Sequence, residues 1–100
     1  MEHHVYFWLK EEHSDERGRA AFEAGLKALC KSPCIQSAHW GRPAATTVRP
    51  VSDQSFDYGL SVKFASLADH DAYQEGDEVH DVFIATFKDW WAKVLVMDLD

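Results

Sequence analysis

Apolar residues occupy both faces of the strand predicted over residues 3–10. Successive side chains of a strand point to opposite sides, so one face carries Val5, Phe7 and Leu9, and the other carries Tyr6 and Trp8. In a sheet with one solvated face, the second set would be polar. A chain of 100 residues can build one layer of helices over one side of a sheet. Burial of the other side requires a partner, so this strand already indicates a dimer.

Residues 14–31 have the periodicity of a helix. Phe22, Leu26 and Leu29 fall at the i, i+4, i+7 spacing of one buried stripe. Ser14 is the expected N-cap, because acidic residues follow it in the first turn. Pro33 prevents the helix from continuing.

Helical patterning returns in the second half of the chain. A short helical turn is expected from about Ser66 to Tyr73, and a longer helix from about Glu78 to Trp91. The apolar stripe of the longer helix consists of Val79, Phe83, Phe87 and Trp90.

Three further strands are predicted. Residues 34–41 have mixed patterning, and residues 94–97 are apolar on both faces. Residues 56–64 alternate cleanly, with Phe56, Tyr58, Leu60, Val62 and Phe64 on one face. Residues 42–55, which include two prolines, form a long loop, and such loops are often functional or reach across an interface.

The order strand, helix, strand, strand, helix, strand predicts an α+β fold over one domain, residues 1–100. Right-handed crossovers give a ferredoxin-like βαββαβ protomer, with a four-stranded antiparallel sheet and the helices on one face. The helix-free face then carries an apolar set with one histidine, namely His4, Tyr6, Trp8, Leu95 and Met97. Two such sheets packed face to face would form a homodimeric α/β barrel, and these residues are its predicted interface.

Charge and targeting signals narrow the possible partners. The formal net charge of −7 disfavours nucleic acids and anionic membranes, since both require a basic surface. No signal peptide or membrane span is apparent, so a cytoplasmic protein is expected. Cys30 and Cys34 are then expected to be reduced thiols, although a local disulfide or half of a metal site stays open.

The sequence resembles the stress-responsive A/B barrel domain family, also called Dabb, over nearly its whole length. The matching segments are residues 3–10, Phe22 to Pro33 in the first helix, Trp40-Gly41-Arg42-Pro43, residues 57–64, Ala72-Tyr73-Gln74, His80 with Phe83, and Trp91 to Asp98. The resemblance implies a dimeric α/β barrel with a ferredoxin-like protomer and no cofactor. Function does not follow from the fold.

One plant member of that family is a cofactor-free polyketide cyclase with a catalytic tyrosine and histidine. The resemblance places the histidine at His80 and, across one extra residue, the tyrosine at Tyr73, with His3 as a pocket histidine. Two further pocket residues of the cyclase are replaced, by Tyr58 and by Gly25. If this chain is an enzyme, the resemblance implies a cofactor-independent, polyketide-cyclase-like lyase.

The residues themselves are compatible with acid/base chemistry. His80 lies at the start of a helix, where the dipole disfavours the imidazolium and a neutral base is plausible. Tyr73 could donate a hydrogen bond to an oxyanion, and His3 could orient a ligand. The predicted ligand-binding residues are His3, Val5, Phe7, Phe22, Tyr58, Leu60, Phe83 and Trp91.

Two functions therefore stay open. The first is binding of a small apolar or aromatic molecule, with His80 and Tyr73 as the catalytic pair. The second is a non-catalytic stress-related or ligand-binding module whose pocket is filled by side chains. No metal site is expected, because no closely spaced chelating motif occurs. His13 and His70 are expected to be solvated.

Overall fold

The computed structural model describes residues 1–100. Its elements are β1 (Glu2–Leu9), the 3₁₀ turn η1 (Glu11–His13), α1 (Glu16–Leu29), β2 (Ser37–Gly41), β3 (Tyr58–Lys63), α2 (Leu67–Gln74), α3 (Glu78–Phe87), the 3₁₀ turn η2 (Lys88–Trp90) and β4 (Trp91–Leu99). The strands form one antiparallel sheet in the order β2-β3-β1-β4. The predicted ferredoxin-like βαββαβ protomer is confirmed, with α2 as an additional short helix.

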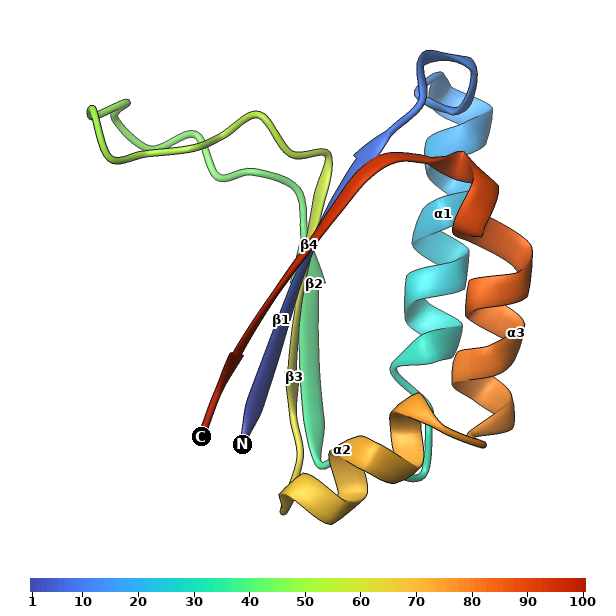
Figure 1. Ribbon diagram of the computed structural model, residues 1–100. Helices are drawn as coiled ribbons and strands as arrows, with labels where there is room; N and C mark the ends of the chain where they lie inside the picture. The colour runs from blue at the N-terminus through green and yellow to red at the C-terminus, as the bar shows by residue number, and fades with distance from the viewer.

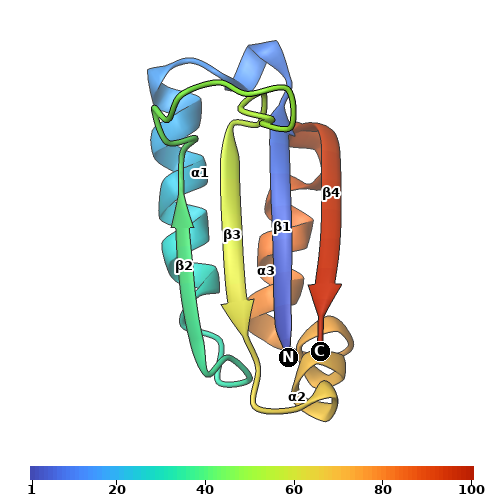
Figure 2. The same cartoon turned by 90° about the vertical axis from the view of Figure 1, so that its left-hand side faces the viewer.

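All helices lie on one side of the sheet (Figure 1). Figure 2 looks onto the other side, where no helix covers the strands. α1 and α3 run behind the sheet, and α2 lies near the end at which both chain termini meet (Figure 2). No helix has the length and hydropathy needed to cross a membrane.

β1 alternates between these two sides as the sequence predicts. His3, Val5, Phe7 and Leu9 are 2–7% exposed and face the helices. The intervening side chains face the open side, where Tyr6 is opposite Leu95 and His4 is opposite Met97 in the register with β4. Leu95, Met97 and Leu99 are 39%, 50% and 57% exposed, so this open face remains largely apolar.

Both long helices differ at one end from the prediction. α1 is capped by Asp15, whose carboxylate accepts a hydrogen bond from the backbone N–H of Gly18 at 2.8 Å. The expected cap Ser14 instead donates its hydroxyl to the Lys10 carbonyl. α3 ends at Phe87 rather than at Trp91, and Trp90 lies in the 3₁₀ turn that follows. The Trp90 ring still packs against Phe87, because the three-residue period of a 3₁₀ turn is close to the spacing of a helical stripe.

Two strands also have other bounds than the sequence predicts. β2 begins at Ser37 rather than Cys34, and β4 extends over nine residues rather than four. Phe56 does not continue the buried face of β3. The chain bends before β3, where the Asp57 N–H bonds to the Phe7 carbonyl, and the Phe56 ring packs edge-on against Tyr6 on the open side.

The predicted long loop between β2 and β3 is present. It projects outward from the open side of the sheet, opposite the helices (Figure 1). The Gln54 amide crosslinks its two limbs by hydrogen bonds to the carbonyls of Ala44 (3.2 Å) and Thr46 (3.1 Å). Val48 and Val51 are 73% and 83% exposed within this loop.

Candidate functional site

A cavity of about 110 Å³ lies between the sheet and the helices. Its wall includes six of the predicted ligand-binding residues, His3, Val5, Phe7, Leu60, Phe83 and Trp91, together with the predicted catalytic pair, Tyr73 and His80. Five lining residues are additional to the prediction, namely Leu29, Gln74, Ile84, Val94 and Val96. Val94 and Val96 are 40% and 44% exposed, so the cavity reaches solvent along the edge strand β4.

Phe22 and Tyr58 do not line this cavity. Phe22 is fully buried in the core, and its ring packs against those of Phe7, Tyr58, Phe83 and Phe87 at centroid distances of 5.1–5.8 Å. Both side chains therefore support the layer between sheet and helices from beside the cavity.

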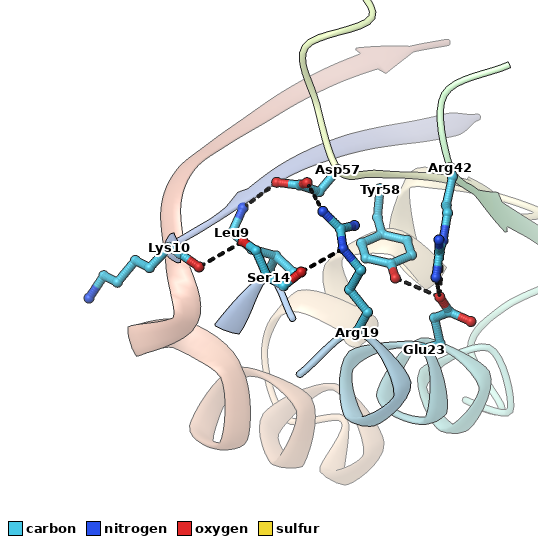
Figure 3. A network of polar contacts seen from close by, with 8 residues as sticks. All are labelled: Leu9, Lys10, Ser14, Arg19, Glu23, Arg42, Asp57 and Tyr58. Atoms are coloured by element: carbon cyan, nitrogen blue, oxygen red, sulfur yellow. Dashed lines mark hydrogen bonds and ion pairs between the residues drawn. The ribbon is translucent and has the colours of Figure 1, made fainter. Parts of the chain in front are cut away.

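The Tyr58 hydroxyl belongs to a polar network that ties α1 to the ends of the neighbouring strands (Figure 3). It donates to Glu23 Oε2 at 2.6 Å, and Arg42 donates to the same oxygen at 2.6 Å. The Tyr58 hydrogen bond, followed by that of Arg42, lowers the pKa of Glu23. Beside it, the Asp57 carboxylate accepts two hydrogen bonds, one from the Arg19 guanidinium at 2.6 Å and one from the Leu9 N–H (Figure 3).

His80 and Tyr73 are adjacent, with ring centroids 4.3 Å apart. The extra residue between them therefore does not separate the two rings. The His80 backbone is fixed by Asp77, which accepts its N–H at 3.3 Å and also accepts the Ser32 hydroxyl at 2.6 Å. This buried link holds the start of α3 against the turn that follows α1.

Two buried polar atoms of the cavity residues have no hydrogen-bond partner: Nδ1 of His80 and Nε1 of Trp91. Leaving a buried polar group unpaired costs about 1–3 kcal/mol, so such atoms are rare in native proteins. Both atoms lie beneath the cavity surface, so a ligand would satisfy them only if the His80 and Trp91 side chains turned toward it. The other polar side chains of the largely apolar lining are His3, Tyr73 and Gln74.

The protonation states of the pair follow from burial. Burial lowers the pKa of His80, although the nearby carboxylates of Asp81 and Asp77 oppose this shift. Burial also raises the pKa of Tyr73, and negative charge at Cys30 or Asp77 would raise it further. At neutral pH, His80 is therefore a neutral imidazole that can accept a proton, and Tyr73 is a phenol that can donate a hydrogen bond.

The lowered pKa of His80 predicts a pH dependence of stability. Because its pKa is lower in the folded state than in the unfolded chain, near 6.5, the unfolded chain binds more protons below that pH. The contribution of neutral His80 is therefore fully present above pH 6.5 and is lost as the pH falls through the folded-state pKa. Imidazole titration by NMR should place the pKa of His80 below that of the urea-unfolded chain. An equal or higher value in the folded protein would contradict this assignment, and His80→Gln should remove only the part of the pH dependence that comes from His80.

Solved structures of the same fold come from several organisms. A protein from Arabidopsis thaliana is 19% identical with a TM-score of 0.80, over 99% of this chain and 92% of that chain. A hydroxynitrile lyase from Passiflora edulis is 20% identical with a TM-score of 0.78, over 96% and 87% of the two chains. A dimeric ferredoxin-like protein from Thermobifida fusca is 13% identical with a TM-score of 0.74, over 96% and 85%. No curated protein matches the chain in sequence.

These likenesses show the fold alone, whereas the family is shown by the sequence itself. The model of the stress responsive A/B barrel domain matches residues 1–100, the whole of the chain described by the structure. The chain therefore belongs to the stress responsive A/B barrel domain (Dabb) family.

Proposed function

We propose that this protein is a homodimer whose protomers each bind a small, largely apolar molecule in the cavity and act on it by cofactor-free acid/base chemistry. The carrying observation is the adjacent pair His80 and Tyr73 on the wall of a largely apolar cavity, with two buried atoms of lining residues, His80 Nδ1 and Trp91 Nε1, left without a hydrogen-bond partner. The solved hydroxynitrile lyase with this fold supports lyase chemistry as the kind to test first.

Each polar residue has a distinct role in this proposal. Neutral His80 takes a proton from the bound molecule, and the Tyr73 hydroxyl beside it stabilises the oxygen that becomes negative. The Trp91 N–H holds a ligand oxygen or nitrogen, and His3 orients the ligand from the β1 side. Asp98 approaches Nδ1 of His3 at 2.5 Å and so fixes the orientation of that ring.

The size of the cavity limits the ligand. An apolar cavity of about 150 Å³ accommodates benzene, and the cavity here measures about 110 Å³. A molecule of about six non-hydrogen atoms, the size of benzene, is therefore close to the upper limit, and a larger one requires the wall at Ile84, Val94 or Val96 to move outward. The volume therefore favours small ligands, aliphatic or aromatic, over larger ones.

The homodimer proposal rests on the open face of the sheet. Its apolar side chains, Tyr6, Trp8, Leu95 and Met97, with His4 beside them, would otherwise contact water, and contiguous apolar patches of this kind mark interaction sites. The Thermobifida fusca protein with this fold is dimeric. The loop over residues 42–55 extends from the same side and would reach the second protomer (Figure 1).

The second candidate is a non-catalytic ligand-binding module, and the small cavity favours it. At about 110 Å³, the cavity leaves room for a ligand but little for the repositioning that a reaction requires. In this case His80 and Trp91 would supply hydrogen bonds for recognition only.

His80→Gln separates the two candidates. We expect the wild type to cleave acetone cyanohydrin. Its hydroxyl proton passes to His80, the C–C bond breaks with its electron pair leaving on cyanide, and protonated His80 returns the proton, so acetone and hydrogen cyanide are released. His80→Gln should slow cyanide release by about 10²–10⁴-fold, the usual contribution of a general base. Colorimetric detection of cyanide measures the rate, and His13→Gln, which alters a histidine outside the cavity, is the matched control.

If the wild type does not cleave acetone cyanohydrin, a binding measurement tests the second candidate. Binding of acetone cyanohydrin or acetone that is lost in Trp91→Phe and His80→Gln would support the ligand-binding module. If the folded wild type neither cleaves nor binds these compounds, the proposed ligand class is wrong. Circular dichroism of each variant confirms that the fold is retained.

A further inference from the structure

Three potential metal ligands that are distant in the sequence meet at one end of the sheet. His3 lies near the start of β1, His70 in α2 and Asp98 near the end of β4, and one ligand atom of each lies within 4.8 Å of the other two. Two imidazole nitrogens and a carboxylate oxygen are a donor set that Zn²⁺ and neighbouring divalent ions use. We propose that this protein binds one divalent transition-metal ion, with Zn²⁺ as the reference ion, through His3, His70 and Asp98.

The spacing is close to that of a metal site. With metal–ligand distances of about 2.0–2.2 Å, the ligand atoms of a tetrahedral zinc site lie about 3.4 Å apart. The three ligand atoms lie within 4.8 Å of one another, so on metal binding the widest separation would have to shorten and the 2.5 Å contact between His3 and Asp98 to lengthen. Asp98 can make this movement because its side chain is 41% exposed, whereas His3, at 6%, is held in place.

The surroundings already orient both imidazoles. The His3 and His70 rings lie edge to face with centroids 5.2 Å apart, and Phe64 packs against both, at 6.2 and 5.5 Å. Asp71 Oδ1 lies 3.1 Å from Nδ1 of His70. Metal-bound histidines commonly donate their second N–H to such a carboxylate, which leaves Nε2 of His70 as the ligand atom.

Asp98 supplies the negative charge that favours a divalent ion, and His3 supplies a neutral nitrogen ligand beside it. Asp98 Oδ1 approaches Nδ1 of His3 at 2.5 Å, a contact bridged by a proton when no metal is bound. The ion would displace this proton, because ligand nitrogens must be deprotonated to bind metal. His70, which the sequence pattern suggested was solvated, has a side chain only 17% exposed and completes the set.

The proposed metal site is separate from the proposed acid/base pair. None of its ligands is His80 or Tyr73, but His3 and Gln74 also line the cavity, so a bound ion would lie at the cavity wall. The sequence offered no signal for the site, because its ligands come from three elements and share no local motif. This proposal therefore replaces the expectation that the chain holds no metal.

Titration of the whole chain, without an added histidine tag and after chelator treatment, tests the proposal. Calorimetry with Zn²⁺ should show one ion per chain, and Co²⁺ should give the strong visible absorption of a four- or five-coordinate site. His70→Ala and Asp98→Asn should each weaken Zn²⁺ binding by more than about 100-fold. Asp71→Asn, which alters only an outer partner, should weaken it by about 10–100-fold.

His13→Ala is the matched control, because His13 stacks on Trp90 in a different part of the molecule, with ring centroids 4.1 Å apart. Unchanged Zn²⁺ affinity in this variant supports the proposed ligands. The proposal is overturned if the folded wild type does not bind Zn²⁺. It is also overturned if binding survives both His70→Ala and Asp98→Asn, or if it weakens equally in His13→Ala. None of these readouts depends on activity, so the acid/base proposal can fail while this one holds, and the reverse.

Discussion

Trp8→Glu should convert the protein to a monomer or to insoluble material. Trp8 lies on the open face of the sheet, where its ring packs edge-on against Phe56. In the proposed dimer, the substitution places a carboxylate between two apolar sheets, and burying an unpaired charge is strongly unfavourable. Sedimentation or light scattering over a range of protein concentrations measures the change.

Lys93 makes a second substitution necessary. Its ammonium lies 4.6 Å from the centre of the Trp8 ring and could partly neutralise a glutamate at that position. Leu95→Glu, alone and combined with Trp8→Glu, removes this ambiguity. Val82→Glu is the matched control, because Val82 is a 59% exposed apolar residue on α3, away from the open face. A soluble dimer of unchanged affinity in the double variant would contradict the proposed interface.

Phe22→Ala should have the largest effect on stability, a loss of about 3–5 kcal/mol in the free energy of unfolding. The side chain is fully buried and contacts four aromatic rings from the sheet and α3. A domain of this size has about 5–15 kcal/mol of total stability, so the variant would lie close to unfolding.

Urea unfolding at a fixed protein concentration measures this loss, since the proposed dimerisation would make stability concentration-dependent. Val82→Ala, which shortens an exposed apolar side chain, should change the free energy of unfolding by less than about 0.5 kcal/mol. If Phe22→Ala costs less than about 1.5 kcal/mol with an unchanged denaturant slope, Phe22 is not the central packing residue that the structure indicates.

The parts of the fold that depend on local periodicity could be predicted from the sequence. The two faces of β1 follow from the period of two, and the α1 stripe follows from the spacing of Phe22, Leu26 and Leu29. The end of α3 could not be predicted. Trp90 remains in line with the stripe after the helix tightens into a 3₁₀ turn, so hydrophobic spacing does not distinguish the two geometries.

The candidate site could be predicted only where strand alternation or the family resemblance supplied its residues. His3, Val5 and Phe7 point toward the cavity because they share the inner face of β1. The family resemblance suggested Tyr58 as a pocket residue, but its side chain fills the core beside the cavity. Periodicity identifies its buried face and does not distinguish these two positions. Gln74, Val96 and the other additional lining residues depend on how α2 and β4 pack, which no local pattern encodes.

The alternation of β1 has a consequence for how such a protein can change. Its odd positions reach the cavity or the core, and its even positions reach the open face, so each substitution in this strand affects one side of the sheet. A new preference of the proposed ligand site could arise at His3 or Val5 while the proposed dimer surface stays intact. The eight residues of β1 therefore determine two properties independently: the lining of the proposed ligand site and the surface of the proposed dimer. Substitutions in this strand can change the first and leave the second unaltered.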